Sequence, residues 1–339
     1  QISPSYSSLL RNYGHLHLVC GQRLLSEWEY TRFRKKPQGG GDRILKSLEE
    51  IYEFNHWDNV EWNEEQKRQA LDAVTKNSTQ KISDEDRAKF QNGANQFWDS
   101  FYDIHQNRFF KDRHWLFTEF EELAPASNEK RTTTETTPPV VPGGRIIFEL
   151  GCGVGNTILP ILKYSREASL RIYGCDFSAK AIEILRTHPE FDAKRCEVFA
   201  MDATLEQWLV PFKEGSLDII VLIYVLSAIE PTKMQRIAAN CYKYLRPGGL
   251  VLFRDYGRYD LVQLRFKSGQ CLQDNFYVRG DGTMVYFFTQ QELRDMFTGV
   301  GFEEVQSVVD RRLQVNRSRM LKMYRVWIQS KFRKPDTAT

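Results

Sequence analysis

The sequence predicts an α/β protein with a seven-stranded, mostly parallel sheet, covered by helices on both faces and preceded by a helical lobe. Two observations predict this fold. From residue 145 onward, short apolar runs alternate with segments of helical periodicity, a pattern typical of parallel strands that are buried on both faces. The first apolar run leads into a glycine-rich loop and then a helix, as in nucleotide-binding α/β domains.

Four regions differ in composition along the 339 residues. Residues 1–42 end in a basic, glycine-rich run and are predicted to be a flexible leader, and residues 43–124 are predicted to be an aromatic, charged helical lobe. Residues 125–144 are rich in Thr and Pro, cannot bury enough apolar surface to fold, and are expected to be a linker. Residues 145–335 are the predicted α/β domain.

The seven strands are expected at apolar runs of that domain. Five should lie in RIIFEL, RIYGCDF, CEVFAMD, SLDIIVLIYVL and GGLVLFRDYG, and the last two, in VQSVVDRRLQV and MYRVWIQSKF, should pair as a hairpin. Helices are expected from about Thr157, Ala179 and Lys233. A further helix should begin at Thr289, because Thr289 and Glu292 have the spacing of a capping box.

Bulk properties exclude some classes of protein. The longest apolar run, residues 219–229, is shorter than the roughly 20 residues that a membrane-spanning helix requires, so no membrane association is expected. The six cysteines show no CxxC pair and no His at zinc-finger spacing, which indicates reduced thiols of an intracellular protein and no metal site. The net charge of +3 is too small to indicate nucleic-acid binding by itself.

A glycine-rich segment, FELGCGVGN at residues 148–156, is the strongest local signal. Gly151, Gly153 and Gly155 lack Cβ atoms, so the backbone can turn sharply there and a ligand can approach closely. A dinucleotide-binding fingerprint would need a glycine where this chain has Asn156. Binding of a nicotinamide dinucleotide is therefore disfavoured.

Two carboxylates follow the next strands. Asp176, at the end of the second strand, is placed to hold ribose hydroxyls, and Asp202, at the end of the third, to accept a hydrogen bond from an adenine amino group. Leu222 and Ile223 of the fourth strand would supply an apolar wall. Each carboxylate alone could be a solvated loop residue, and for Asp202 this alternative is equally favoured. Three elements at the ends of successive strands together favour S-adenosylmethionine as the cofactor.

Several longer segments resemble one family. They include FWDSFY, FFKDRHWLFTEFEEL, ELGCGVGN, LDIIVLIYVLSAI, LFRDYGRYD, NFYVRGDGT and DRRLQVNR, and the similar stretch runs from Phe54 to Pro335 apart from the linker. The chain is similar to the eukaryotic tRNA 3-methylcytidine methyltransferases, class I, Rossmann-like enzymes that depend on S-adenosylmethionine. The resemblance implies tRNA as the partner, with the methyl group placed on N3 of a cytidine in the anticodon stem-loop.

The resemblance also implies which residues bind the cofactor. Trp98 and Tyr102 are spaced i, i+4, so they lie on one helix face. From the spacing alone, burial in a core is the favoured interpretation, whereas the resemblance favours a lid over the cofactor. The implied residues are Trp98 and Tyr102 from the lobe and Gly151, Asp176, Asp202, Ala203 and Ile223 from the sheet edge.

The reaction that the resemblance implies needs little acid or base chemistry. N3 of cytosine attacks with its own lone pair and carries no proton, so no strong general base has to act first. Positive charge develops on the base, and Asp255, after the fifth strand, is the candidate catalytic carboxylate that would stabilise it. Pairing of Asp255 with Arg254 or a neighbouring arginine is an equal alternative.

Basic residues interleaved with aromatic ones indicate a tRNA-binding surface. Cations can neutralise phosphates, and aromatic rings such as those of Phe266, Phe276 and Tyr277 can stack on unpaired bases. A run of charges is more often a solvated face, so each assignment has this alternative. The candidates are Lys111, Arg113, His114, Arg254, Arg258, Arg265, Lys267, Arg279, Arg311 and Arg312.

Other functions stay open from the residues alone. The chain could be a methyltransferase that acts on a protein or a small molecule, or a non-catalytic RNA-binding subunit that uses the fold as a scaffold. An accessory protein such as an aminoacyl-tRNA synthetase is a further candidate partner. The cytoplasm is the expected compartment, and Arg11 and Arg23, in a stretch without acidic residues, keep mitochondria as the alternative.

Overall fold

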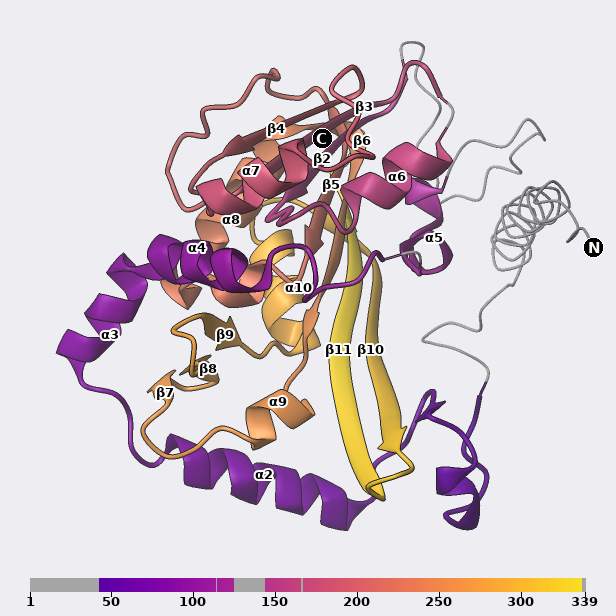
Figure 1. Ribbon diagram of the computed structural model, residues 1–339, viewed down its shortest axis with the longest axis vertical. Coiled ribbons are helices and arrows are strands. Elements are labelled where there is room, and N and C mark those ends of the chain that lie inside the picture. Colours follow the sequence, from indigo (N-terminus) through magenta and orange to yellow (C-terminus); the bar gives the residue numbers. More distant parts are fainter. Residues whose placement is uncertain (1–42, 114, 125–143, 166, 337–339) are drawn as a thin grey trace, which may run out of the picture.

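The computed structural model describes residues 43–113, 115–124, 144–165 and 167–336. The predicted leader, all but the last residue of the predicted linker, and His114 lie outside these residues. The described residues form one large sheet with helices on both faces, a smaller sheet, and a lobe that wraps around them (Figure 1).

The large sheet has eight strands. They are β1 (His56–Trp57), β2 (Ile146–Leu150), β3 (Arg171–Asp176), β4 (Cys196–Ala200), β5 (Leu217–Ile223), β6 (Leu245–Tyr256), β10 (Glu303–Asn316) and β11 (Leu321–Arg333). Their order across the sheet is β1-β10-β11-β6-β5-β2-β3-β4. The pairs from β6 to β4 are parallel and the others are antiparallel. The seven predicted strands are confirmed, and the eighth, β1, comes from the lobe.

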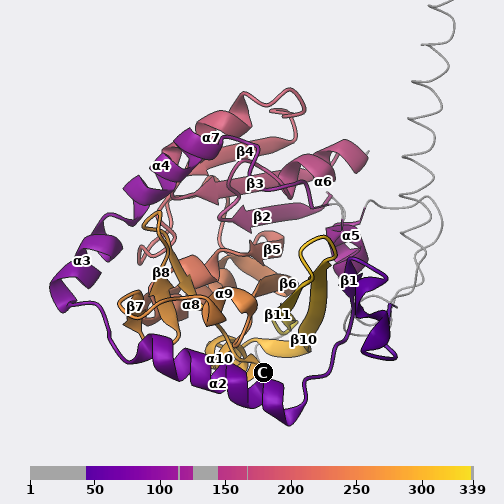
Figure 2. The same ribbon diagram turned by 60° about the horizontal axis from the view of Figure 1, so that its bottom comes forward.

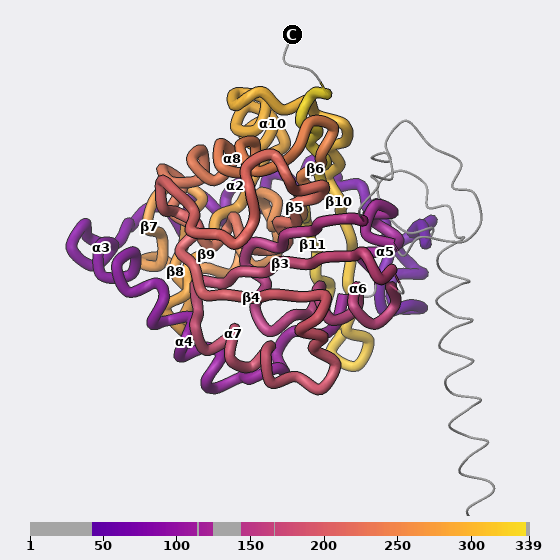
Figure 3. Tube along the Cα trace, turned by 90° about the horizontal axis from the view of Figure 1, so that it is seen from above, coloured from indigo at the N-terminus to yellow at the C-terminus, as the bar shows by residue number. Residues whose placement is uncertain are grey.

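Helices cover both faces of the large sheet (Figure 3). They are α5 (Leu116–Glu119), α6 (Ile158–Tyr164) and α7 (Ala179–Arg186) on one face, and α8 (Pro231–Tyr244) and α10 (Gln290–Thr298) on the other. The helices predicted from Thr157, Ala179 and Lys233 are confirmed to within two residues. The capping box of α10 is also confirmed, because Thr289 and Glu292 each accept a hydrogen bond from the other's amide.

The lobe meets the large sheet or its covering helices at three places, the first of which is the pairing of β1 with β10. Besides β1 and α5, its elements are η1 (Glu49–Tyr52), α2 (Glu64–Ser78), α3 (Asp84–Asn92), α4 (Ala94–His105) and η2 (Glu121–Leu123). α2 passes along the outside of the molecule, and the chain returns through α3 so that α4 lies against α7 (Figure 2). Farther on, α5 and η2 pack on the face that carries α6.

A small antiparallel sheet, which was not predicted, follows β6. It consists of β7 (Cys271–Gln273), β8 (Phe276–Val278) and β9 (Met284–Tyr286), reached through the short helix α9 (Leu261–Leu264). Phe276 and Tyr277 are fully buried in it, and Phe266 stacks on Tyr277 with ring centroids 4.6 Å apart. The expectation that these three rings stack on bases is therefore wrong, because they form the core of the small sheet.

Candidate active site

The glycine-rich loop after β2 is closely surrounded. Gly151 and Gly153 have φ values of +66° and +52°, in the left-handed region that favours glycine. A Cβ atom on Gly151 would lie 2.3 Å from Val225 Cγ2, and one on Gly153 would lie 2.6 Å from the Tyr102 hydroxyl. The loop therefore lies between the lobe and the segment after β5, and side chains at these glycines would fill the space.

Gly155 differs from the other two glycines. It is not among the described residues that line the pocket beside the loop. A Cβ atom on Gly155 would lie 2.4 Å from Leu185 of α7, so this glycine permits helix packing and the expected cofactor contact is not supported. The next residue, Asn156, donates hydrogen bonds to the carbonyl of Phe110 and the carboxylate of Asp112, each at 3.3 Å, and ties the lobe to the loop.

Asp176 ends β3 and lines the same pocket as Gly151 and Gly153. Its carboxylate accepts hydrogen bonds from the amides of Gly153 at 2.8 Å and Ser178 at 2.9 Å. Burial raises the pKa of Asp176 to about 6, and these two amides act in the opposite direction. Each carboxylate oxygen retains a further lone pair, so Asp176 can still accept a hydrogen bond from a ligand hydroxyl.

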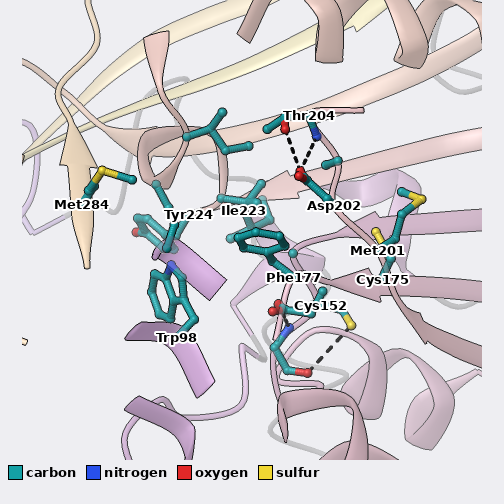
Figure 4. Close-up of a pocket in the computed structure, with 18 of the residues that line it drawn as sticks. Trp98, Cys152, Cys175, Phe177, Met201, Asp202, Thr204, Ile223, Tyr224 and Met284 are labelled. Atoms are coloured by element: carbon teal, nitrogen blue, oxygen red, sulfur yellow. Dashed lines mark hydrogen bonds between the residues drawn. The ribbon is translucent and has the colours of Figure 1, made fainter. Parts of the chain in front are cut away.

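Asp202 and Ala203 follow β4 and line the pocket as well. The amide and the hydroxyl of Thr204 donate to Asp202 Oδ1 at 2.8 and 2.7 Å, which fixes the carboxylate (Figure 4). The carbonyl of Ala203 accepts a hydrogen bond from Trp208 Nε1 at 3.0 Å. Ile223, the last residue of β5, adds an apolar surface to the same pocket.

The lid of the pocket comes from α4. Trp98 and Tyr102 line the pocket, with ring centroids 6.0 Å apart. Asp99, between them in sequence, accepts hydrogen bonds from the Ser178 hydroxyl at 2.5 Å and the Lys180 amide at 3.2 Å, at the start of α7. This anchor was not predicted, because an acidic residue among aromatic ones gives no signal until its partner is known.

One pocket thus brings together most of the predicted cofactor residues, and we call it the cofactor pocket (Figure 4). Phe177, which was not predicted, also lines it and is 39% exposed, so ring surface is available to a planar ligand. The predicted residues that line it are Trp98, Tyr102, Gly151, Gly153, Asp176, Asp202, Ala203 and Ile223, and further lining residues include Phe110, Met201, Tyr224, Ala228 and Met284.

A second cavity, which we call the basic groove, adjoins the cofactor pocket. The outer parts of β10 and β11, which extend past β6, form one of its walls. Five residues line both cavities and define the junction between them: Trp98, Phe110, Arg113, Tyr224 and Ala228. The lining of the groove includes the cations Lys111, Arg113, Arg254, Arg279, Arg312, Arg317 and Arg325 and the aromatic residues Phe101, Phe109, Trp115, Tyr256 and Trp327.

The predicted tRNA-binding residues lie in different settings. Arg258 pairs with Glu292 at 2.8 Å, so its charge is already partnered within the fold. Arg265 and Lys267 are exposed and are not among the described residues that line the basic groove. His114 lies outside the described residues. Of the others, Lys111, Arg113, Arg254, Arg279 and Arg312 line the basic groove, whereas Arg258 and Arg311 line a separate hollow beside α2.

Arg254 is a structural residue although it reaches the basic groove. It is 4% exposed and pairs with Asp310 at 2.5 Å. Its guanidinium carbon lies 5.1 Å from the ring centroid of Trp115 and 5.1 Å from that of Trp327. A cation held by a buried carboxylate and two rings has little capacity left for a phosphate, so its predicted tRNA contact is not supported.

Asp255 is fully buried and is not among the described residues that line the cofactor pocket or the basic groove. Its carboxylate accepts hydrogen bonds from the amides of Ser227 at 2.9 Å and Tyr256 at 2.8 Å, and burial raises its pKa to about 6. The predicted catalytic contact is thus not supported. Of the alternative pairings, the one with Arg254 is wrong, because Arg254 pairs with Asp310, whereas the charge of a neighbouring arginine, Arg279, does act on Asp255 and lowers its pKa. Asp255 instead fixes the turn η3 (Leu226–Ala228), which carries Ala228 of the junction.

Arg113 connects the lobe to the sheet at the junction. Its Nη1 donates to Thr157 Oγ1 at 2.9 Å and lies 3.5 Å from the carboxylate of Glu149. Burial raises the pKa of Glu149 to about 7, and Arg113 acts in the opposite direction. The amide of Arg113 also donates to the carbonyl of Asn156 at 2.8 Å, so both backbone and side chain are fixed.

Two features are absent from the described part of the chain. It contains no group of three or more His, Cys, Asp or Glu side chains that could hold a metal ion. No helix within the described ranges is long and apolar enough to cross a membrane. Cys152 and Cys175, beside the cofactor pocket, are buried free thiols, and burial raises the pKa of each well above its usual range.

Several known methyltransferases are similar to this chain. Residues 148–251 match the model of a methyltransferase domain family. The tRNA N(3)-methylcytidine methyltransferase Mettl2 of Drosophila melanogaster is 64% identical over 98% of this chain and 99% of that protein. The tRNA N(3)-cytidine methyltransferase METTL2 of Danio rerio is 50% identical over 89% of this chain and 90% of that protein. The tRNA N(3)-methylcytidine methyltransferase trm140 of Schizosaccharomyces pombe is 41% identical over 87% of this chain and 91% of that protein. A solved S-adenosylmethionine-dependent methyltransferase of Methanosarcina mazei, 18% identical, has a TM-score of 0.43 over 58% of this chain and 95% of that chain.

Proposed function

Because the chain belongs to the tRNA N3-methylcytidine methyltransferase family, we propose that it methylates N3 of a cytidine in the anticodon loop of tRNA, with S-adenosylmethionine as the methyl donor. One structural observation supports the proposal most strongly. A pocket with polar groups for an adenosyl cofactor adjoins a groove lined by cations and aromatic rings, and the two share five residues. Cations and aromatic rings are the groups that bind RNA phosphates and unpaired bases.

The residues of the cofactor pocket fit S-adenosylmethionine. Gly151 and Gly153 leave a cradle at the sheet edge that Cβ atoms would fill. Asp176 would hold the ribose hydroxyls and Asp202 the adenine amino group, with Phe177 against the adenine ring. When bound, S-adenosylmethionine supplies a methyl carbon that its positively charged sulfur makes electrophilic.

The lid residues would exclude water from the reacting atoms. Tyr102 is 5% exposed, and its hydroxyl lies where a Cβ atom on Gly153 would collide with it. Burial raises the pKa of Tyr102 well above its usual range, so the hydroxyl stays protonated and can donate a hydrogen bond. Trp98 lines both the cofactor pocket and the basic groove, so it would separate the cofactor from solvent at the junction.

The target base would reach the junction from the basic groove. A loop nucleotide is unpaired, so its Watson–Crick edge can be turned toward the junction at low cost. Lys111, Arg279 and Arg317 line the groove and would neutralise phosphates on either side of that nucleotide. N3 carries no proton, so the contribution of the chain is to align the reacting atoms rather than to remove a proton.

The test uses the purified full chain, labelled S-adenosylmethionine and unmodified tRNA transcripts, with the product identified by nucleoside mass spectrometry. We expect 3-methylcytidine in the anticodon loop and no label in proteins or small molecules. Label in either of those pools would favour a different substrate class. Retained tRNA binding without cofactor binding, measured by calorimetry, would favour a non-catalytic RNA-binding subunit.

We also propose that the protein acts in the cytoplasm, with mitochondria as the alternative and an accessory protein such as an aminoacyl-tRNA synthetase as a candidate partner. Nucleoside analysis of tRNA separated by compartment, in cells with and without the protein, tests the location. Activity of the purified chain on naked transcripts tests the need for a partner. Full activity there would make an accessory protein unnecessary for the transfer.

A further inference from the structure

Tyr224 lies where the cofactor pocket meets the basic groove, directly after Ile223 at the end of β5. We propose that the target cytosine stacks on Tyr224 during methyl transfer, and that the face of this ring stabilises the positive charge that the cytosine acquires. The assignment rests on the proposed function, since it names the residue that receives the substrate base.

The backbone at Tyr224 supports this role. Its φ is +58°, a conformation that residues with a Cβ atom rarely adopt and that the surrounding structure must hold in place. The amide of Tyr224 donates to the carbonyl of Arg254 at 2.9 Å, and the next residue, Val225, lies against Gly151. In the described chain, Tyr224 is the one non-glycine residue with positive φ that lines the cofactor pocket.

Tyr224 belongs to a row of side chains from four separate segments. Arg113 of the lobe lies 5.7 Å from its ring centroid, and the ring of Tyr256, at the end of β6, lies 5.4 Å away at an interplanar angle of 50°. Arg279, after β8, lies 5.8 Å from the ring of Tyr256. All four residues line the basic groove, and Figure 4 shows Tyr224 and Trp98 close together on one side of the cofactor pocket.

The two arginines of this row are held in place by the protein. Arg113 donates to Thr157 Oγ1 at 2.9 Å, and Arg279 donates to Thr283 Oγ1 and the carbonyl of Met284, each at 3.3 Å. Arg113 is also paired with the buried Glu149 at 3.5 Å, so it serves to position the row, whereas the remaining N–H groups of Arg279 can meet a phosphate beside the target nucleotide. The base of that nucleotide would then lie over the tyrosines, between Arg113 and Arg279.

The charge that develops during the reaction explains why an aromatic face is needed there. The lone pair of N3 forms the new bond to the methyl carbon, while the electron pair of the breaking carbon–sulfur bond remains on sulfur. The positive charge therefore passes from sulfur to the cytosine ring, and no proton moves in this step. Arg113 and Arg279 oppose a cationic base, whereas the face of an aromatic ring attracts one.

Two substitutions separate the ring from its hydroxyl. Y224L removes the aromatic face, and we expect it to lower the single-turnover methylation rate by about tenfold or more, which corresponds to about 1.4 kcal/mol. Y224F keeps the ring and should stay within about threefold of the wild type. Y259L is a matched control, because Tyr259 also has positive φ, at +67°, but lines the hollow beside α2, so its rate should be unchanged.

A binding measurement distinguishes charge stabilisation from a structural role. The probe is an anticodon stem-loop oligonucleotide with or without 3-methylcytidine, under mildly acidic conditions in which the methylated base is cationic. We expect the wild type and Y224F to bind the methylated form preferentially, Y224L to lose this preference, and all three to bind S-adenosylhomocysteine with equal affinity. Wild-type rate and preference in Y224L would overturn the assignment alone, whereas a wild-type protein that forms no 3-methylcytidine would overturn the proposed function with it.

Discussion

At the scale of single residues, Asp176 is the group whose charge matters most for the cofactor pocket. Burial raises its pKa to about 6, while the amides of Gly153 and Ser178 hold its carboxylate in place. Because the pKa is raised on folding, this group favours the folded state below its ordinary pKa of 3.8 and loses that contribution as the pH rises through about 6. Binding of ribose hydroxyls should depend on pH in the opposite way and strengthen as the pH rises, since the ionised carboxylate is the better hydrogen-bond acceptor.

The first prediction concerns the pH dependence of cofactor binding by Asp176. We expect the affinity of the wild type for S-adenosylhomocysteine to fall by up to about tenfold per pH unit below about pH 6, as Asp176 takes up a proton. In D176N, which cannot ionise, the affinity should be lower at neutral pH and nearly constant down to about pH 5. Calorimetric titrations at a series of pH values measure both effects. A wild-type affinity that does not change over this range would contradict the assignment of Asp176.

Sequence position alone does not fully distinguish carboxylates that line the cofactor pocket from those that have a structural role. Asp176, Asp202 and Asp255 all lie at the ends of strands, and the first two line the cofactor pocket as predicted. Asp255 is buried instead, because the turn after β5 folds over it and its carboxylate accepts the amide hydrogen of Ser227. Which way a side chain points at a strand end depends on the next turn, and the sequence pattern contains no signal for that turn.

At the scale of elements, the docking of α4 on α7 closes the cofactor pocket. Asp99 accepts hydrogen bonds from two groups at the start of α7, and it lies one turn from the lid residue Tyr102. Hydrogen bonds to a charged group contribute about 1.5 to 3 kcal/mol each, and the partial exposure of Asp99 reduces this. The anchor therefore contributes to cofactor binding through the lid rather than by direct contact.

The second prediction tests this anchor. D99A should weaken S-adenosylhomocysteine binding by about tenfold, because the lid is no longer fixed over the cofactor pocket. D103A is the matched control on the same helix. The carboxylate of Asp103 is 62% exposed and lies 3.5 Å from Lys180 Nζ, and such a surface ion pair contributes little to stability. Calorimetry on both variants gives the comparison. Equal affinities in D99A and D103A would contradict a role for the anchor.

Long, periodic elements could be predicted from the sequence, and short ones could not. All seven predicted runs became strands, because buried parallel strands need continuous apolar residues and the long hairpin of β10 and β11 has room for a clear alternation. β1 has two residues and the strands of the small sheet have three each, too few to show alternation. As a result, the interleaving of basic and aromatic residues wrongly predicts that Phe276 and Tyr277 lie on an RNA-binding surface, although they form the core of the small sheet.

At the scale of the whole molecule, the cations are not equivalent. Arg279 lines the basic groove, and its guanidinium donates hydrogen bonds to the hydroxyl of Thr283 and the carbonyl of Met284. Arg265 is exposed and lies outside the set of described residues that line the groove. Since phosphate contacts release counterions, only a cation in the RNA path affects the salt dependence of binding.

The third prediction follows from this difference. R279A should weaken tRNA binding and lower the slope of log K against log salt concentration by about one, because one phosphate contact is lost. R265A changes the net charge by the same amount and should leave the slope unchanged. Binding isotherms at several salt concentrations measure both slopes. Equal slopes for the two variants would contradict binding of RNA along the basic groove.

The central claim at this scale is that the cofactor pocket and the basic groove communicate through the junction. Ala228 is the smallest residue there, it is half-buried, and it lines both cavities. A large side chain at this position would close the passage between them while leaving Asp176 and Arg279 untouched. The junction can therefore be blocked without substituting Asp176 or Arg279.

The most direct measurement is single-turnover transfer of labelled methyl groups to tRNA by A228W, with A228S as the conservative control. We expect A228W to bind S-adenosylhomocysteine and tRNA with affinities close to those of the wild type, yet to lose at least about a hundredfold in transfer rate, because the reacting atoms can no longer meet. A228S should remain close to the wild type. Transfer by A228W at the wild-type rate, with both ligands bound, would contradict the claim.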